Sequence, residues 1–249
     1  MPIRPATWAD LSAISSLCAG SFQDDELFGE MMHPLRKEYP VDFEQYFVRR
    51  NRVNWWDYTH VWYVATTTDI VDGKEQEVVA GIAEWELQGT VSTKLAWWDP
   101  RNSLKPTMSL LNRLSLFCFP NRAANPDPLK RDPFYASFPF FHHHWQGERA
   151  NSVYLDLLAV HPKYQGRGLA KELVQWGLDK ADAAGVCASV IASESGYGLY
   201  KRMGFTTEVG RCTEGEGNPL GELKSGAILF KDYKKGSDKS NNTNEEDKN

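Results

Sequence analysis

The sequence has few cysteines, no long apolar run and no concentration of positive charge. Its cysteines form no Cys-x-x-Cys pair, so we expect buried free thiols and neither a zinc site nor a redox motif at Cys18, Cys118, Cys187 and Cys212. No apolar run approaches the roughly twenty residues of a membrane span. Residues 1–5 lack the apolar core of a secretory signal. We therefore expect a soluble, cytoplasmic protein that makes no membrane contact.

The charge and the length of the chain limit its function and its domain count. The formal net charge of −5 argues against broad nucleic-acid binding, because neutralising phosphates requires a concentrated basic surface. With 249 residues, of which 41% are hydrophobic, the chain can bury a sizeable core, and we expect one domain over residues 1–233. From Lys234 the composition changes to Lys, Ser, Asn, Asp and Glu without an apolar anchor. This change predicts a disordered polar tail at 234–249.

Residues 154–184 carry the strongest functional signal. The run from Tyr154 to Val160 is apolar except for Asp156, which is typical of a strand buried on both faces. A glycine-containing loop follows, and from Gly168 apolar residues return at helical spacing until Gly185 provides a stop. The pattern predicts a strand, a glycine loop and a helix.

Such a junction is suited to phosphate binding. The first N–H groups of a helix have no internal partner, and the helix dipole places partial positive charge there. Gly166 and Gly168 lack a Cβ, so a diphosphate can approach the backbone closely, and Arg167 and Lys171 add positive charge. The alternative is that the two glycines only form a tight turn.

Two motifs in this half of the chain resemble the GNAT acetyltransferase superfamily. Gln165-x-x-Gly168-x-Ala170, directly after the strand, is similar to the acetyl-CoA pyrophosphate loop of that superfamily. Leu199-Tyr200-x-x-x-Gly204-Phe205 is similar to the segment that carries its thiolate-protonating tyrosine. A Rossmann loop fits poorly, because position 171 is Lys where a third glycine is needed, and the P-loop signature is absent.

The resemblance implies a fold and a reaction. It implies an α/β (α+β) GNAT fold, in which a central mixed, mostly antiparallel and twisted sheet has splayed central strands and flanking helices. It also implies that an acetyl group moves from acetyl-CoA directly to an amine acceptor in a ternary complex. Tyr200 matches the family's general acid, and Ser193 occupies the position at which many members have an Asn that helps to hold the cofactor arm. The resemblance assigns the remaining cofactor contacts to Leu158, Ala159, Val160, Gln165, Gly166, Arg167, Gly168, Leu169 and Ala170.

The reaction also needs a base. An alkylamine with a pKa of about 10.4 is mostly protonated at pH 7 and must lose a proton before it attacks. The candidates are Asp156, Glu84 and Glu86. Alternation along the strands predicts that Asp156 shares a face with Tyr154, Leu158 and Val160, and that Glu84 and Glu86 share a face of the preceding strand. The sequence does not choose among the three carboxylates.

The remaining elements follow from periodicity and turn signals. Strands are expected at 3–5, 60–70, 77–87, 187–192, 206–209 and 227–231, with a turn at Asp72-Gly73 between the second and third. Helices are expected around 11–18, 28–31, 42–56 and 108–119.

Residues 90–150 exceed a minimal GNAT domain, and we expect an insertion that packs over the acceptor side of the cleft. Within it, His142, His143 and His144 cannot point the same way, which argues against a metal site. They are loop or packing residues, or one of them is a substrate contact or proton relay. The acidic run from Asp24 to Glu26 is either a solvated helix start or an attractor for a cationic amine.

Two other functions remain open from the sequence. One is a catalytically silent acyl-CoA-binding or regulatory protein of the same fold. The other is a nucleotide-binding module that uses the glycine loop. The acceptor, whether small amine, antibiotic, peptide N-terminus or lysine, is undetermined, as is the oligomeric state.

Overall fold

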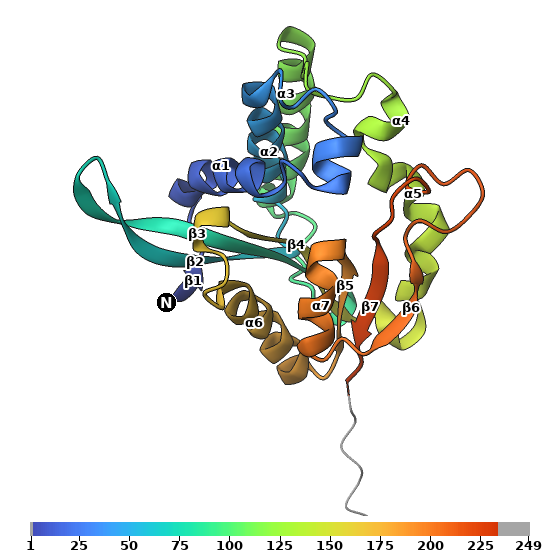
Figure 1. Ribbon diagram of the computed structural model, residues 1–249. Coiled ribbons are helices and arrows are strands. Elements are labelled where there is room, and N and C mark those ends of the chain that lie inside the picture. The colour runs from blue at the N-terminus through green and yellow to red at the C-terminus, as the bar shows by residue number, and fades with distance from the viewer. Residues whose placement is uncertain (1, 234–249) are drawn as a thin grey trace, which may run out of the picture.

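A computed structural model describes residues 2–233, which form a seven-stranded sheet flanked by helices (Figure 1). The strand order is β1-β2-β3-β4-β5-β7-β6, and all neighbours pair antiparallel except β4 and β5. The strands are β1 (Ile3–Pro5), β2 (His60–Val71), β3 (Lys74–Leu87), β4 (Ser152–Val160), β5 (Cys187–Ala192), β6 (Thr207–Arg211) and β7 (Ala227–Lys231). The predicted mixed, mostly antiparallel sheet is confirmed. The tail expected at 234–249 lies outside the described residues.

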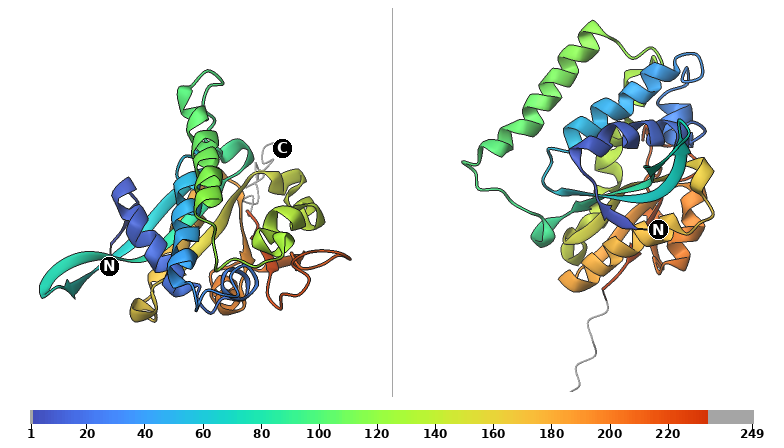
Figure 2. Two further views of the ribbon diagram at one scale, coloured as in Figure 1. Left: turned by 90° about the horizontal axis from the view of Figure 1, so that it is seen from above. Right: turned by 90° about the vertical axis from the view of Figure 1, so that its left-hand side faces the viewer.

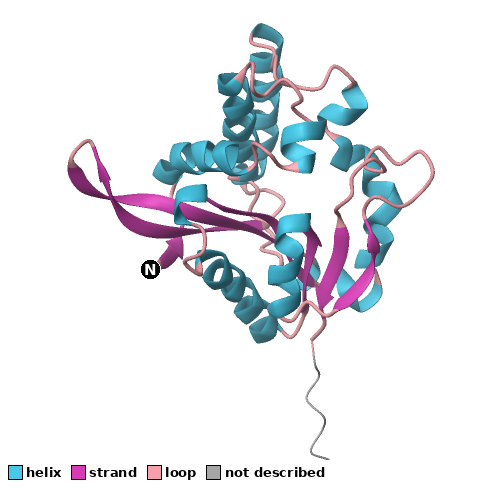
Figure 3. Ribbon diagram, in the orientation of Figure 1, coloured by secondary structure: helices cyan, strands magenta, loops and turns pink. Residues whose placement is uncertain are grey.

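Helices cover both faces of this sheet (Figure 3). The α-helices are α1 (Leu11–Ser21), α2 (Pro40–Asn54), α3 (Leu104–Cys118), α4 (Pro128–Arg131), α5 (Pro133–Phe141), α6 (Leu169–Ala184) and α7 (Glu194–Arg202). On one face α1 and α2 bury Ile14 and Phe47 against Ile82 of β3. On the other face α6 buries Leu173 and Leu178 against the sheet. Cys18, Cys187 and Cys212 are buried, Cys118 is exposed, and all four thiols are free.

The sheet opens between its two central strands. Parallel pairing of β4 with β5 runs only from Ser152↔Cys187 to Leu155↔Val190. Beyond Leu155, β4 continues along β3, whereas the end of β5 pairs with β7. The two strands therefore diverge at the level of Asp156, and the predicted splay is confirmed.

A β-bulge at Asp156 changes which residues of β4 face which side. Leu155 pairs with Trp85 and Leu157 pairs with Glu84, so Asp156 is an extra residue without a partner on β3. Leu158 and Val160 pack with the α6 side, whereas Asp156 bonds Arg50 of α2 on the opposite side. The expectation that Asp156 shares a face with Leu158 and Val160 is therefore wrong, because the bulge breaks the period-two alternation.

The insertion between β3 and β4 divides into two parts. Figure 2 shows α3 along the outside of α2, where Asn112 Nδ2 donates to the Arg49 carbonyl at 2.7 Å. The outer surface of this part is apolar: Phe117 is 89% exposed and Trp97 86% exposed. The second part, with α5 and the short turn η5 (His142–Trp145), returns to the open end of the sheet. None of the described helices is long and apolar enough to cross a bilayer.

The contact of α6 with the sheet depends on a glycine. A Cβ at Gly177 would lie 2.2 Å from the Trp85 ring, and Trp85 is fully buried with little room to move. We expect Gly177→Ala to lower the free energy of unfolding by about 2–3 kcal/mol through overpacking. Gly20→Ala, near the end of α1 with nothing within 4 Å of the added Cβ, is the control and should raise it by about 0.5 kcal/mol. Urea denaturation measures both, and equal stabilities would contradict this packing.

Candidate active site

A cavity of about 550 Å³ occupies the opening between β4 and β5. Its floor comes from Tyr154 to Leu158 of β4 and from Val190 to Ala192 of β5, and α7 contributes Tyr200. The opposite wall comes from the insertion, with Phe134, Phe138, Phe141, His142 and Trp145. The cavity thus extends from the splayed strands to the insertion.

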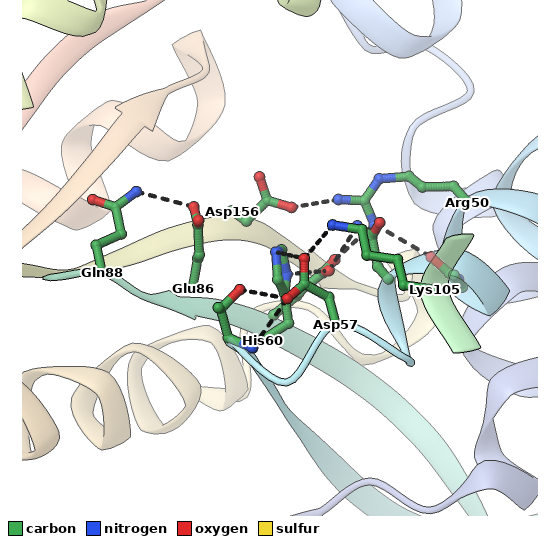
Figure 4. A network of polar contacts seen from close by, with 11 residues as sticks. Arg50, Asp57, His60, Glu86, Gln88, Lys105 and Asp156 are labelled. Atoms are coloured by element: carbon green, nitrogen blue, oxygen red, sulfur yellow. Dashed lines mark hydrogen bonds and ion pairs between the residues drawn. The ribbon is translucent and has the colours of Figure 1, made fainter. Parts of the chain in front are cut away.

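A buried ion-pair network lies beneath this cavity (Figure 4). The Arg50 guanidinium of α2 donates to Glu84 Oε2 at 2.6 Å and to Asp156 Oδ2 at 2.5 Å. Glu84 Oε1 also accepts from Asn54 Nδ2 at 2.9 Å and lies 2.7 Å from His60 Nδ1. One cation therefore holds two carboxylates from adjacent strands.

Glu84 is the internal member of this network. Its side chain is fully buried, and both of its carboxylate oxygens already have partners. Burial alone would raise the pKa of Glu84, but the charges and bonds of Arg50 and His60 outweigh it and lower that pKa to about 2. Glu84 is thus held as an anion and has no oxygen directed at the cavity.

Asp156 is the member that reaches the cavity. Its side chain retains 26% exposure, and because the residue lines the cavity, this surface faces the cavity interior. Among residues 2–233, only Arg50 donates to the carboxylate, at Oδ2, and no bond reaches Oδ1. Burial raises the pKa of Asp156, and the nearby negative charge of Glu84 adds to this, so that Arg50 offsets the increase only in part. Asp156 therefore differs from Glu84 in both respects: it faces the cavity, and its pKa is raised.

Glu86, the third carboxylate candidate, also lines the cavity. Gln88 Nε2 donates to its Oε2 at 2.9 Å (Figure 4). Unlike Glu84, it makes no bond to Arg50 or His60 within the described residues. Glu86 is thus at the site but outside the charge network.

His60 and Arg50 are site residues that the sequence did not single out. His60 lines the cavity, and its register opposite Glu86 places it beside the carboxylates. Burial opposes protonation of His60, but the bond to Glu84 outweighs burial and raises its pKa above the usual value. The only local signal for either residue was a polar side chain within an otherwise apolar face, and such positions are common.

His60, Glu84 and Asp156 offer ligand atoms within 4.8 Å of one another, a spacing that a metal ion requires. The Arg50 guanidinium bonds both carboxylates, however, so a positive charge already occupies the space between them. An ion would have to displace Arg50 and leave it buried without a partner, at a cost of several kcal/mol. The donor set thus favours an ion-pair network over a metal centre.

Tyr200 lies at the other side of the cavity. It is 6% exposed, and its ring packs over Gly196, where a Cβ would lie 2.8 Å from the ring. Burial raises the pKa of Tyr200 above its usual value of 10, so the hydroxyl remains protonated at neutral pH. Ser193 also lines the cavity, where its Oγ accepts the Gly196 N–H at 3.2 Å and caps α7.

The predicted phosphate loop follows β4 and leads into α6. Gly166 and Gly168 have φ of 76° and 85°, in the left-handed region that favours glycine, and nothing lies within 4 Å of a Cβ at either position. Gly168 is the N-cap of α6, and no side chain caps this end. Gln165 Nε2 donates to the Val160 carbonyl at 3.1 Å and so holds the loop against β4.

The other predicted loop residues have different environments. Leu169 is buried in the core, and the Arg167 guanidinium lies 5.3 Å from the centre of the Tyr164 ring. Neither the loop nor Ala159 and Val160 line the cavity. The loop is instead an exposed helix N-terminus beyond the end of β4.

Of the three histidines and the three acidic residues that the sequence singled out, only one of each lines the cavity. His142 lines the cavity and stacks on Phe138 at 5.2 Å, whereas His143 and His144 lie against each other away from it. Asp25 lines the cavity and accepts the N–H groups of Leu27 and Phe28, as the cap of the helical turn η2 (Glu26–Met31). Burial raises the pKa of Asp25.

Comparison with known proteins agrees with this geometry. Residues 135–205 match the family model described as the acetyltransferase (GNAT) family. A protein described as an acetyltransferase from Stachybotrys chartarum is 27% identical over 207 residues, covering 82% of this chain and 79% of that protein. The uncharacterized N-acetyltransferase YhbS of Escherichia coli is 43% identical over 60 residues, covering 24% of this chain and 35% of YhbS.

Solved structures extend the similarity to the fold of most of the chain. A structure described as histone acetyltransferase HPA2 and related acetyltransferase from Corynebacterium glutamicum has a TM-score of 0.55 at 17% identity, covering 93% of this chain and 96% of that one. Arylalkylamine N-acetyltransferase 2 from Aedes aegypti has a TM-score of 0.50 at 15% identity, covering 94% and 99%. The family match spans all of β4, the glycine loop and Tyr200, and the whole sheet has the same fold as these acetyltransferases. The chain is thus similar to GNAT acetyltransferases in sequence over residues 135–205 and in fold over most of its length.

Proposed function

We propose that the protein transfers an acetyl group from acetyl-CoA directly to an amine held in a ternary complex. The observation that carries this proposal is that Asp156, a carboxylate with a raised pKa, and Tyr200, a protonated phenol, line one cavity at the splayed strands. These two groups supply the base and the acid that the reaction needs. In this proposal residues 1–233 form one catalytic domain, and the insertion at about 90–150 supplies the acceptor wall.

Donor binding is assigned to the end of β4 and the start of α6. The diphosphate would meet the uncapped N–H groups that follow Gly168, while the backbone of Leu158 to Val160 holds the pantetheine arm. The route is supported by the splay, because β4 beyond Leu155 has no β5 partner and its edge is available. YhbS, which shares the 60-residue match, has been crystallised with CoA. Ser193 and Gln165 are assigned to the same donor side.

The proposed reaction uses Asp156 as the base and Tyr200 as the acid. Asp156 takes one proton from the acceptor ammonium, and the free amine attacks the carbonyl carbon of the thioester. The C–N bond forms and the C–S bond breaks, while Tyr200 gives its proton to the departing thiolate. The amide nitrogen releases its second proton, which restores Tyr200, and the proton on Asp156 leaves to solvent. Each turnover yields the amide, free CoA and one proton.

Tyr200→Phe tests the acid. We expect kcat to fall about 10²-fold, because the thiolate loses its proton donor, while the KM for acetyl-CoA stays within about twofold. Thiol release measures both constants. The matched control is Tyr197→Phe on the same helix, whose hydroxyl bonds Glu208 at 2.8 Å and does not line the cavity; it should retain full activity. CoA binding without thiol release in the wild-type protein would instead support a silent acyl-CoA-binding protein.

Asp156→Asn tests the base. The raised pKa of Asp156 means that kcat/KM should fall on acidification at a higher pH than an ordinary carboxylate would cause. We expect the substitution to reduce kcat about 10²-fold and to abolish this acidic limb of the pH–rate profile. Glu86→Gln, which changes a second carboxylate in the same cavity, should cost less than tenfold and keep the limb. The opposite ranking would move the role of base to Glu86.

Gly168→Ala tests the phosphate loop. An added methyl would enter the space assigned to the diphosphate, so we expect the Kd for CoA to rise at least tenfold by calorimetry. The positive φ of 85° adds a backbone cost of about 1–2 kcal/mol. Gly217→Ala has a similar φ of 77° and equally open surroundings, so it controls for that strain and should leave the Kd unchanged. Equal CoA affinities in the two variants would contradict the assignment.

A further inference from the structure

We propose that the acceptor is a small primary amine that carries an aromatic or similarly large apolar group and no carboxylate. This inference rests on the proposed acetyl transfer and assigns its substrate class. It follows from the aromatic residues in the cavity walls, from the charges around Asp156 and from the short separation between the aromatic wall and Asp156.

A continuous aromatic wall runs from the insertion to the central sheet. The ring centres of Phe134 and Phe141 lie 6.5 Å apart, those of Phe141 and Trp145 6.3 Å, and those of Trp145 and Tyr154 5.8 Å. All four residues line the cavity. The three ring contacts are all edge-on, which leaves ring faces and edges for another aromatic group. An acceptor with a ring gains apolar contact along this wall, whereas ethylamine or a similarly small amine does not.

Aromatic residues of η2 and α2 also line the cavity. Phe28 lies 6.3 Å from Tyr46 between ring centres, and both residues line the cavity. Burial raises the pKa of Tyr46 well above its usual value, so its hydroxyl is a neutral group. The apolar part of the acceptor would therefore have rings from η2 and α2 as well as from the insertion within the same cavity.

The charges around the reacting end favour a cation. Asp156, Glu86 and Asp132 line the cavity as carboxylates. Arg50 and His60 also line it, but the Arg50 guanidinium is bonded to Glu84 and Asp156 and is 15% exposed, and His60 Nδ1 is bonded to Glu84. A carboxylate on the acceptor would thus approach other carboxylates and find its nearest guanidinium already paired, which is unfavourable in a site of low dielectric.

The short separation between the aromatic wall and Asp156 limits the length of the chain that joins the acceptor's ring to its amine. Tyr154, the last ring of the insertion wall, precedes Asp156 by two residues on β4, so the wall ends beside the proposed base. A ring joined to the amine by a short alkyl chain meets both features at once. This arrangement matches a free arylalkylamine better than an amino acid.

A panel of acceptors tests the inference by thiol release from acetyl-CoA. We expect 2-phenylethylamine to exceed both phenylalanine and ethylamine in kcat/KM by at least tenfold. Phenylalanine differs from it only by a carboxylate, and ethylamine only by the ring. Equal rates with phenylalanine would overturn the charge argument, and equal rates with ethylamine would overturn the aromatic wall.

A pair of variants in the insertion tests the wall directly. Phe138 lines the cavity and is 56% exposed, and its ring centre lies 5.9 Å from that of Phe141. Phe138→Ala therefore removes apolar wall surface at an exposed side chain. We expect the KM for 2-phenylethylamine to rise about five- to tenfold, while the KM for acetyl-CoA is unchanged. Phe117→Ala on α3 removes an 89% exposed ring that does not line the cavity and should change neither constant.

The panel also separates this inference from the function on which it rests. Thiol release with spermidine or with a lysine-containing peptide, but not with 2-phenylethylamine, would overturn the acceptor class and leave acetyl transfer to an amine standing. Release with 2-phenylethanol alone would overturn the amine and retain the aromatic wall. No release with any acceptor would overturn both proposals.

Discussion

The guanidinium of Arg50 lies between Glu84 of β3 and Asp156 of β4, and the polar part of the site depends on this contact. Two carboxylates this close repel each other, and each would cost several kcal/mol if buried without a partner. Arg50 offsets both costs with one charge. Because Glu84 is wholly enclosed and has further donors while Asp156 faces the cavity, the pKa of Glu84 falls and that of Asp156 rises. Burial and partner number, rather than residue type, separate the two carboxylates.

Two irregularities of the sheet make this arrangement accessible to a substrate. The bulge turns Asp156 toward α2 and away from the face that carries Leu158. At the same level β4 parts from β5, so the sheet opens where the carboxylate is exposed. A regular β4 would have directed position 156 to the α6 side, where Leu158 and Val160 lie. These two breaks in regular pairing thus set both the direction of the Asp156 side chain and the opening of the sheet beside it.

The segment between β3 and β4 supplies one side of the cavity. Its α5 and η5 segments carry the aromatic wall, whereas α3 lies outside α2 and contributes nothing to the cavity. The parts of the cavity thus come from separate elements: β4 carries Asp156, α7 carries Tyr200, and the insertion shapes the aromatic wall. Such a division lets the wall vary without altering the chemistry.

Local sequence determined the elements closest to the cofactor side. The strand that ends at Val160, the glycine loop and the helix from Leu169 to Ala184 were all predictable, because apolar periodicity, glycine and helix capping act over a few residues. The motifs around Gly168 and Tyr200 were likewise sufficient to predict the family and the splayed sheet.

Tertiary structure alone decided how the charged residues of the cavity are arranged. Arg50 meets Glu84 across 34 positions and Asp156 across 106, and His60 reaches the site only through the register of β2 with β3. The bulge at Asp156 depends on how β3 pairs beside it, which no periodicity within β4 records. The two halves of the insertion are both apolar, and only packing directs α5 to the cavity and α3 to the outside. Long-range pairing and burial, which set the pKa values, are properties of the folded chain and not of any short segment.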